Sequence, residues 1–520
     1  MFDILIKNGK VIDGTGSPAY FADVAVKDGK IVKVKKGIKG DAKQIIDATG
    51  LVVTPGFIDS HGHNDSFVLS HPEMTEKVEQ GITTTIAGQC GDSIAPISNY
   101  IKTPKQIGDF GIQLDLYKTM GTLLDIAKNV PQGSNTGILM GHSQLRRAVM
   151  GLENRAPTAE EMQKMKDLVR DGMEHGAMGV SFGLFYAPGC YAEVDECIEL
   201  AKIVKEYEGI ITSHIRDEAD YLIRSTKEFI AIVKGSGCRG VISHHKSYEK
   251  EENWGKVTHT LRMIDETNAE GYDLYCDVYP YIASHTNMQS MFIPREDRSA
   301  GLEGLTKMLE DPQYRERVRN INVNYYGKTD LDWVQVTICP GNPEYSGRIV
   351  GDIAREKGQD PYETLFDIMH DSKVACSACY FTMCEEDVET VMAHSRTMIC
   401  TDSGIAAGKT FFHPRLSASF TRTLGEYVRE RGVTTLPEMI RKMTAMPAAV
   451  YGLKTKGLIW DNMDADICIF DADKIVDKAS FTDCKARAEG LNYVIIGGEI
   501  VAENAVHNGK RCGKVLLRED

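Results

Sequence analysis

The sequence predicts an α/β protein, and three patterns along its 520 residues lead to that expectation. Both chain ends consist of short β-type runs separated by turns. The middle alternates amphipathic helices with short apolar strands, which is typical of βα units and a parallel sheet. One charged segment interrupts the alternation. We therefore expect a (β/α)8 TIM barrel, a small β-sandwich domain built from both chain ends, and an inserted lid segment.

The small β domain is expected over residues 1–54 and 458–520. Turns such as Asp13-Gly14-Thr15-Gly16 and Gly497-Gly498 separate its apolar runs. The expected strands lie at residues 4–6, 11–12, 24–26, 31–34, 466–470, 493–496 and 515–517. Because the two ends share this pattern, we expect their strands to pair with each other.

The barrel is expected over residues 55–457. Thr158 and Glu161 are spaced as a capping box before a helix, and Gly176 separates that helix from a strand at 177–182. The cycle then repeats, with helices at residues 194–204, 219–234 and 258–270 and strands at 210–212, 241–242 and 274–278. Residues 285–345 break this rhythm with charged and polar stretches. We expect that insertion to cover one face of the barrel as a lid.

Composition excludes several classes of partner. The chain has 60 Lys and Arg against 74 Asp and Glu, a net charge of −14, and no basic block that could follow a phosphate backbone. We therefore expect neither nucleic acid nor an anionic membrane as a partner. With no signal-peptide core and no window of membrane-span length, the chain is expected to be cytoplasmic. The oligomeric state is left open.

The cysteines are odd in number, 13, and scattered along the chain, which indicates reduced thiols. Cys376 and Cys379 form a CxxC pair, but no second pair follows them. Their role stays open.

Potential metal ligands follow the expected strands. His61 and His63 stand two residues apart after an apolar run, so both imidazoles of an extended segment can point to one side. Four further strands end at a potential ligand: Cys90, His214, His244 and Asp402. Each of these alone would be an ordinary buried residue. Because the carboxyl ends of barrel strands share one mouth, together they predict a metal site there.

Longer motifs around these residues resemble the amidohydrolase superfamily, and within it the N-acyl-D-amino-acid deacylase branch. The first motif is His61-Gly62-His63-Asn64-Asp65 after Pro55-Gly56-Phe57-Ile58-Asp59. The others are Gly88-Gln89-Cys90-Gly91, Gly183-Leu184-Phe185-Tyr186-Ala187-Pro188-Gly189, Thr212-Ser213-His214, Ile242-Ser243-His244-His245-Lys246, Asn253-Trp254-Gly255, Tyr279-Pro280-Tyr281, His413-Pro414-Arg415 and Met443-Thr444-Ala445-Met446-Pro447-Ala448. The resemblance runs from about residue 3 to about residue 475. Its most specific element is Cys90, because this branch uses a Cys thiolate where most relatives bridge their metals with a carboxylated Lys.

The resemblance implies two metal positions. It places the tighter one on Cys90, His214 and His244. It lines a weaker second one with His61, His63, Cys90 and Asp402. Zn²⁺ suits this mixture of thiolate and imidazole, and the branch is similarly described as zinc-dependent. Whether one or two metals serve the working enzyme is left open.

The expected mechanism starts from a water whose pKa the metal lowers to about 7, so that hydroxide can attack an amide carbonyl. Asp402 is the expected general acid and base, a role that does not exclude ligation. Tyr186 could donate a hydrogen bond to the oxyanion, with a core position as the alternative. Lys246 and Arg415 are expected to bind the carboxylate of an anionic small-molecule substrate, with Ser284 as a weaker polar contact.

These residues predict zinc-dependent hydrolysis of the linear amide bond of an N-acyl-D-amino acid, which releases a carboxylate and a free D-amino acid. The preference for the D form follows from the resemblance alone. Two alternatives remain: a cyclic amidase, as hydantoinases and dihydroorotases are, and a non-catalytic scaffold with the same fold. The sequence does not determine the preferred side chain or acyl group.

Overall fold

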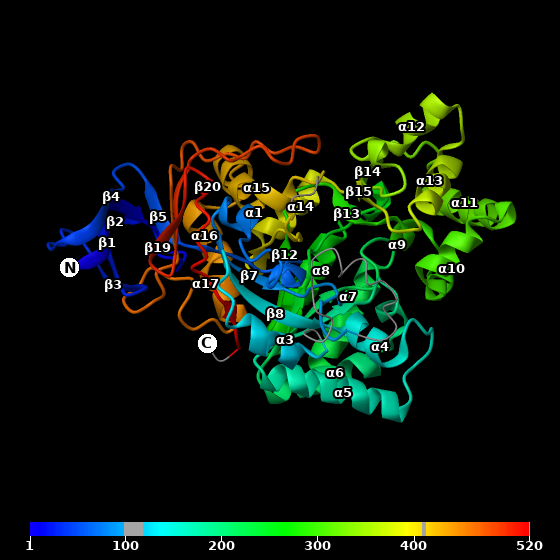
Figure 1. Ribbon diagram of the computed structural model, residues 1–520, viewed down its shortest axis with the longest axis horizontal. Coiled ribbons are helices and arrows are strands. Elements are labelled where there is room, and N and C mark those ends of the chain that lie inside the picture. The colour runs from blue at the N-terminus through cyan, green and yellow to red at the C-terminus, as the bar shows by residue number, and fades with distance from the viewer. Residues whose placement is uncertain (98–117, 408–411, 519–520) are drawn as a thin grey trace.

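The computed structural model describes residues 1–97, 118–407 and 412–518. Three parts follow each other along its long axis (Figure 1). A sheet formed by both chain ends lies at one end, a barrel lies in the middle, and a largely helical segment inserted before the last barrel strand lies at the other end. The expected α/β class and TIM barrel are confirmed.

Eight parallel strands form the barrel, and each pairs with the next in chain order. They are β6 (Phe57–Asp59), β7 (Ile82–Ala87), β8 (Asn135–Gly141), β9 (Gly179–Gly183), β10 (Ile210–His214), β11 (Arg239–Ile242), β12 (Leu274–Val278) and β16 (Thr397–Ile399). The segments after the first and last strands meet at the mouth. There Asp402 N donates to His61 O (2.9 Å) and His63 N donates to Ser403 O (3.0 Å). These bonds bring residues from opposite ends of the barrel sequence into one site.

Helices cover the outside of the barrel: α3 (Met120–Ala127), α4 (His142–Met150), α5 (Ala159–Glu174), α6 (Val194–Glu206), α7 (Leu222–Ser236), α8 (Val257–Ala269), α14 (Glu385–Ala393) and α16 (Leu436–Met443). Helices α5 to α8 pack side by side in chain order. The capping box expected at Thr158 and Glu161 is present at the start of α5, where Glu161 N donates to Thr158 Oγ1 at 3.2 Å. Shorter elements near the mouth are α1 (Thr75–Val78) and α15 (Arg415–Arg422), which η7 (Thr423–Glu430) continues.

The interior of the barrel is apolar. Its strands, or the residue directly before one, contribute Ile58, Ile86, Leu139, Met178, Ile210, Val241, Tyr275 and Met398. Helix α17 (Ala445–Val450) closes the amino-terminal end, because Arg239 at the start of β11 donates to the carbonyl groups of Ala449 and Val450. Polar ligands therefore gather at the opposite, carboxyl end.

The two chain ends form one nine-stranded sheet in the order β20-β19-β18-β17-β5-β1-β2-β3, with β4 beside β1. The strands are β1 (Phe2–Val11), β2 (Tyr20–Lys27), β3 (Lys30–Lys35), β4 (Ala42–Asp47), β5 (Val52–Pro55), β17 (Ile467–Phe470), β18 (Leu491–Ile496), β19 (Glu499–Glu503) and β20 (Val506–His507). Strand β5 joins the two ends, because it pairs with β1 and with β17. Their common core includes Ile6 and Val24 from one end and Ile467 and Ile495 from the other.

The last expected strand lies elsewhere. Strand β21 (Val515–Leu516) pairs in parallel with β8 of the barrel, with Val515 opposite Thr136. Leu516 is buried in the same cluster as the barrel interior. The structure therefore assigns the end of the chain to the barrel and corrects the expected boundary of the small domain. An apolar pair is buried more fully there than at the edge of an open sheet.

The inserted segment leaves the barrel after β12 and covers residues 279–384, before α14 and β16. It contains an antiparallel sheet of β13 (Ser284–Asn287), β14 (Val334–Ile338) and β15 (Ser377–Tyr380), and the helices α9 (Met288–Phe292), α10 (Gly301–Met308), α11 (Pro312–Tyr326), α12 (Val350–Lys357) and α13 (Pro361–Asp371). It extends past the expected end at residue 345 because the central strand of this sheet, β15, comes later in the chain. Figure 1 shows α10 to α13 far from the sheet of the chain ends.

Within the described parts of the chain, no helix combines the length and the apolar composition that crossing a membrane requires.

Candidate metal centre

All six predicted ligands lie at or just beyond the carboxyl ends of barrel strands: His61 and His63 after β6, Cys90 after β7, His214 at the end of β10, His244 after β11 and Asp402 after β16. Three of them have a positive φ, 56° at Cys90, 36° at His244 and 48° at Asp402. Bulky residues are uncommon in this left-handed region, and such strain gathers at functional sites. These sharp turns direct the side chains into the mouth.

Close packing of backbone holds the turn that carries Cys90. A Cβ at Gly183, the last residue of β9, would lie 1.9 Å from Cys90 O. Gly88 has a φ of 77°, and a Cβ there would lie 2.2 Å from Leu139 O. Ser181 Oγ of β9 donates to Gly88 O at 2.6 Å. Only glycine at these two positions allows the turn after β7 to approach β8 and β9 this closely.

The Cys90 thiol lies between three imidazoles. Its Sγ is 3.3 Å from His61 Nε2, 3.3 Å from His244 Nε2 and 3.7 Å from His214 Nδ1. Zinc binds sulfur at about 2.3 Å and nitrogen at about 2.0 Å, so two such ligands on one tetrahedral ion lie roughly 3.5 Å apart. The spacing and the soft donor set therefore fit a zinc ion.

Asp402 adds a carboxylate to this cluster. Its Oδ1 lies 3.4 Å from His61 Nε2 and 3.1 Å from His63 Nε2. Ligand atoms within 4.8 Å of one another come from His61, Cys90, His244 and Asp402. The structure thus brings all six predicted ligands to one mouth.

A buried carboxylate that sequence reasoning missed supports two of the imidazoles. Glu218, 2% exposed, lies 3.1 Å from His244 Nδ1 and 3.5 Å from His214 Nε2. These nitrogens face away from Cys90, so Glu218 orients both rings and leaves their other nitrogens for a metal. Glu218 follows His214 by four residues. An acidic residue soon after a predicted ligand at the end of a strand was the sequence signal that could have indicated Glu218.

Asp277, at the end of β12, supports the site in a similar way. Its Oδ1 lies 3.8 Å from His61 Nδ1 and accepts a hydrogen bond from His244 N. The carboxylate therefore links the segments after β6 and β11. A carboxylate near the end of an apolar strand was the sequence signal for Asp277, and the sequence analysis did not identify it.

Lys77 ties the two ends of the barrel together beside Asp402. Its fully buried ammonium donates to Asp59 Oδ2 (2.8 Å), Thr401 Oγ1 (2.7 Å) and Ser403 O (2.7 Å). Asp59 Oδ1 in turn accepts from Thr401 N at 2.9 Å. Thr401 and Ser403, on either side of Asp402, are therefore held next to Asp59, which comes shortly before His61 and His63 in the chain.

Burial controls the pKa of three of the predicted ligands, His214, His244 and Cys90. It lowers the pKa of His214 and His244 well below the usual range, so both rings are neutral and can offer a lone pair. Burial raises the pKa of the Cys90 thiol, and the charge of Asp402 adds to this. A bound dication acts in the opposite direction and keeps a thiolate. Burial would also raise the pKa of Asp402, but the charge of Arg415 opposes it and the pKa lies well below its usual range.

The sequence model described as Amidohydrolase family matches residues 44–318 and 357–502. The chain belongs to the amidohydrolase family. A D-aminoacylase of Alcaligenes xylosoxydans xylosoxydans is 33% identical over 518 residues, which cover 99% of this chain and 98% of that protein. The crystal structure of a D-aminoacylase is 32% identical, with a TM-score of 0.84 over 99% of this chain and 100% of that one. An N-acyl-D-glutamate deacylase from Bordetella bronchiseptica, solved with zinc and a phosphonate mimic of the tetrahedral intermediate, is 33% identical, with a TM-score of 0.83 over 99% of both chains. The resemblance expected from the motifs is confirmed.

Tyr186 of this amidohydrolase lies beside a metal ligand. Its ring packs edge-on against His214, with centroids 4.8 Å apart. Its hydroxyl oxygen accepts a hydrogen bond from Thr286 Oγ1 at 3.0 Å. Burial raises the pKa of Tyr186 well above its usual range, so the phenol keeps its proton at neutral pH. That proton can be donated toward the mouth.

Lys246, an expected carboxylate-binding residue, has partners of its own. Its buried ammonium lies 2.7 Å from Glu218 Oε2, 3.0 Å from His244 O and 2.7 Å from His244 Nδ1. The structure therefore places Lys246 in the support of His244. A substrate carboxylate would reach it only by replacing one of these contacts.

The guanidinium of Arg415 has hydrogen-bond partners at Nη1 and Nη2 but none at Nε among the described residues. Its Nη1 donates to Asp402 Oδ2 at 2.7 Å, and its Nη2 donates to His285 O at 3.4 Å. Among the described residues, Arg415 Nε has no hydrogen-bond partner. The same is true of the buried hydroxyl of Ser284, which precedes His285. These two polar groups remain to bind a ligand.

The CxxC pair of this amidohydrolase lies outside the metal centre. Cys376 Sγ contacts Met288 Sδ at 3.5 Å, and Cys379 is buried in β15. In the parts of the chain that the structure describes, neither thiol belongs to a group of metal-ligating side chains.

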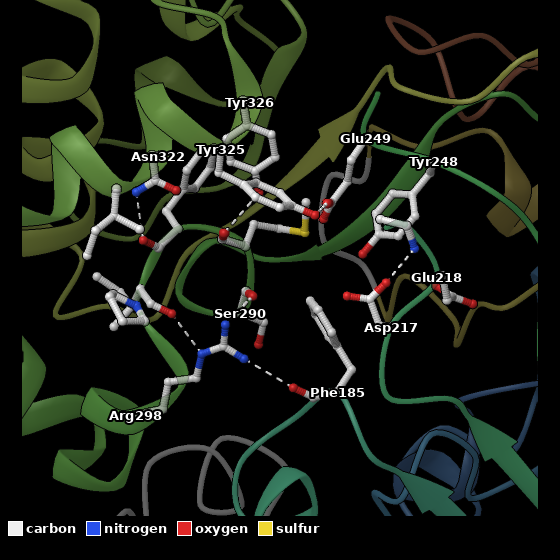
Figure 2. A pocket seen from close by; sticks show the side chains of 16 residues that line it. Phe185, Asp217, Glu218, Tyr248, Glu249, Ser290, Arg298, Asn322, Tyr325 and Tyr326 are labelled. Atoms are coloured by element: carbon white, nitrogen blue, oxygen red, sulfur yellow. Dashed lines mark hydrogen bonds between the residues drawn. The ribbon is translucent and has the colours of Figure 1, made fainter. Parts of the chain in front are cut away.

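A pocket of about 180 Å³ is lined by Phe185 and Glu218, two residues that contact the candidate ligand His214, and we call it the side pocket (Figure 2). Its barrel wall consists of residues 185, 217–219 and 248–249. Its other wall belongs to the inserted segment, with residues 290–294, 298, 321–322 and 325–326. The side pocket therefore exists only where the inserted segment meets the mouth.

Proposed function

We propose that this amidohydrolase uses zinc to hydrolyse the linear amide bond of N-acyl-D-amino acids, giving a carboxylate and a free D-amino acid. The observation that carries the proposal is the Cys90 thiol between three imidazoles, with Asp402 beside them, at the mouth of the barrel. Relatives that match nearly the whole chain are deacylases of this type. They support a linear amide over the cyclic amides of hydantoinases and dihydroorotases.

The residues that would hold zinc are Cys90, His214 and His244, with His61, His63 and Asp402 at a weaker position next to them. When bound there, the ion would polarise the amide carbonyl and lower the pKa of a water to about 7. Glu218 and Asp277 keep the imidazoles in place from behind. This support fixes the ligands before substrate arrives.

Asp402 is positioned to move protons. Its Oδ2 is held by Arg415, while Oδ1 faces His61 and His63. Oδ1 can accept a proton from the attacking water and deliver it to the nitrogen that leaves. The ion pair with Arg415 keeps the carboxylate ionised and fixes its orientation. Ligation of the metal through the same carboxylate is compatible with this role.

Tyr186 would stabilise the oxyanion that forms when the amide carbonyl is attacked. Its hydroxyl already accepts from Thr286 Oγ1, which orients the phenol and leaves its own proton for a developing negative charge. Its edge contact with His214 keeps that proton near the metal ligands.

The carboxylate of the substrate would bind at Arg415 and Ser284. Arg415 Nε and Ser284 Oγ are buried donors without a partner among the described residues, and the Nε edge of a guanidinium suits a carboxylate. Lys246 would contribute only if it released Glu218 or His244. In a protein of net charge −14, these cations are what admits an anionic substrate.

A substrate panel tests the proposal. Zinc-loaded protein should hydrolyse N-acetyl-D-amino acids, and the panel should include N-formyl and N-carbamoyl derivatives, the L forms and hydantoins. Hydrolysis of hydantoins alone would show a cyclic amidase. A protein that contains no stoichiometric zinc after purification without chelators and turns over no amide would be a scaffold.

The replacement Asp402→Asn tests the proton carrier. We expect kcat to fall by more than about 100-fold, because general acid–base catalysis contributes roughly 10²–10⁴-fold. Metal analysis should still find zinc, since the tighter position does not need this carboxylate. Asp23→Asn is the matched control, because Asp23 is a buried carboxylate of the end sheet. Near-normal turnover of Asp402→Asn would refute the role.

A further inference from the structure

The side pocket lies one layer away from the reacting centre. The ring of Phe185 stacks on His214, with centroids 5.3 Å apart and planes at 22°. Glu218, on the same wall, contacts both His214 and His244. In an N-acyl amino acid the side chain branches from the atom next to the nitrogen of the scissile bond. A pocket this close to the ligands is therefore within reach of that side chain.

We infer that the side pocket receives the side chain of the D-amino acid and selects a basic one. The inference rests on the proposed function and adds the substrate class to it. Overall identity does not decide this point, because a D-aminoacylase and an N-acyl-D-glutamate deacylase are each 33% identical to this chain.

Two carboxylates in the pocket lack a cationic partner. Glu249 accepts a hydrogen bond from the Tyr325 hydroxyl at 2.5 Å, and Asp217 accepts from the backbone N–H groups of Ala219 and Tyr221. Within the described parts of the chain, neither carboxylate forms an ion pair. Burial raises the pKa of Glu249 to about 7. A cation close to Glu249 would relieve this cost of burial.

The other charged groups of the pocket already have hydrogen-bond partners. Glu218 is paired with Lys246 at 2.7 Å. The guanidinium of Arg298 donates to three backbone carbonyl groups, those of Ile293, Phe185 and Ser290, at 2.8–3.1 Å. Figure 2 shows Glu249 and Asp217 on one side of the pocket and Arg298 on the other. The side with the two carboxylates therefore has an unmatched negative charge.

Aromatic rings make up much of the remaining wall. Phe185, Tyr248, Phe292, Tyr325 and Tyr326 all line the pocket. Cations of this chain already lie over three of these rings: Lys246 over Tyr248, Lys250 over Tyr325 and Arg298 over Phe185. The rings can also bury the methylene stem of a lysine or arginine side chain. Ile321, at the outer rim, is 43% exposed, so the head can keep part of its water. An acidic side chain would lose its hydration beside two carboxylates.

The test compares three substrates on zinc-loaded protein: N-acetyl-D-lysine, N-acetyl-D-norleucine, which has a similar stem without the charge, and N-acetyl-D-glutamate. We expect kcat/KM for D-lysine to exceed that for D-norleucine by about tenfold, the size of one partly desolvated cation contact. D-glutamate should be the poorest of the three. A preference for D-glutamate, or equal values for all three, would overturn the inference.

The variant Glu249→Gln identifies the residue that selects. It should lower kcat/KM for D-lysine by about tenfold and leave that for D-norleucine within about twofold, so that D-norleucine also reports that the variant is folded. Glu252→Gln is the matched control, because Glu252 is an exposed carboxylate three residues away. Equal losses on both substrates would contradict the inference. If the variant does not fold, the comparison of substrates on the unaltered protein decides.

Two outcomes separate this inference from the function on which it rests. If no N-acyl-D-amino acid is hydrolysed, the proposed function fails, and the inference fails with it. If neutral or acidic D-substrates are hydrolysed without a basic preference, only the inference fails. An effect of Glu249→Gln that follows the length of the acyl group, measured with N-acetyl and N-hexanoyl substrates, would assign the pocket to the acyl group and overturn the inference as well.

Discussion

Cys90 combines features that an ordinary buried cysteine lacks. Its backbone has a φ of 56°, and its Sγ faces three imidazoles within 3.7 Å. Burial alone raises the pKa of the thiol and keeps it protonated. A bound cation would favour the thiolate, so this position suits a metal ligand. At the level of single residues, the metal centre is therefore built around this side chain.

Replacing Cys90 by Ala should remove the metal. We expect affinity for zinc to fall by more than about 100-fold, because even groups behind the ligands account for about 10–100-fold. Zinc content after dialysis measures the effect. Cys379→Ala is the control, since Cys379 is equally buried but lies in β15 of the inserted segment. Full retention of zinc by Cys90→Ala would show that the thiol is not a ligand.

Lys77 and Asp59 form a fully buried ion pair. Removing only one charge leaves the other buried without a partner, so Lys77→Met should lower the free energy of unfolding by about 3–5 kcal/mol. The double variant with Asp59→Asn should lose less, because the uncompensated charge is gone. Lys128→Met, which breaks an exposed pair with Asp125, should cost only about 0–1 kcal/mol. Urea unfolding measures all three, and equal losses for Lys77→Met and Lys128→Met would contradict the argument.

At the level of elements, β9 determines how the loop after β7 lies. The glycine that ends β9 leaves room for Cys90 O, and Ser181 of the same strand binds Gly88 O. The candidate ligand after β7 thus depends on the absence of a side chain at the end of β9, two strands along the barrel. This dependence is geometric and involves no charge.

The replacement Gly183→Ala should therefore weaken metal binding. The new Cβ would lie 1.9 Å from Cys90 O, so the loop must shift, and overpacking of this kind costs about 1–3 kcal/mol. Titration with zinc should show reduced affinity. Gly37→Ala serves as the control, because Gly37 has a positive φ of 67° but no atom within 4 Å of an added Cβ. The Gly37→Ala variant should lose some stability and keep its affinity for zinc. An unchanged affinity for zinc in Gly183→Ala would rule out the packing argument.

At the level of the whole molecule, the far end of the chain completes the barrel. Strand β21 pairs with the start of β8, and Leu516 joins the apolar interior at 1% exposure. In the sequence, strands β17 to β20 of the end sheet come between the last barrel strand, β16, and β21. The two parts are therefore expected to unfold together.

Leu516→Ala tests this link. We expect it to lower the free energy of unfolding by about 2–5 kcal/mol, as other buried leucines do when truncated. Val506→Ala, at a position that is 42% exposed, should change it by less than about 0.5 kcal/mol. Thermal or urea unfolding monitored by circular dichroism measures both. Turnover at low temperature should be unchanged, since Leu516 is remote from the mouth. A loss as small as that of Val506→Ala would show that β21 does not support the barrel.

Most of the barrel, and the meeting of the six candidate ligands at one mouth, could be predicted because their signals are local. Helix and strand periodicity mark each βα unit, and His214, His244 and Asp402 stand directly where a strand ends. The supporting residues are harder to predict. For Glu218 the only signal is its spacing of four residues after His214. Lys77 lies in helix α1, and nothing near it in the sequence shows that it will meet Thr401.

The sequence by itself determined the fold class, the family and the place of the six candidate ligands at the mouth, because regular βα repeats bring every strand end to one side of the barrel. Only the tertiary structure decided which charges are paired. It joined Lys246 to Glu218 and Arg415 to Asp402, moved the last strand to the barrel, and formed the side pocket between the mouth and the inserted segment. The reason is physical: pairing and burial depend on contacts between residues far apart in the chain, and such contacts leave no periodic pattern in the sequence.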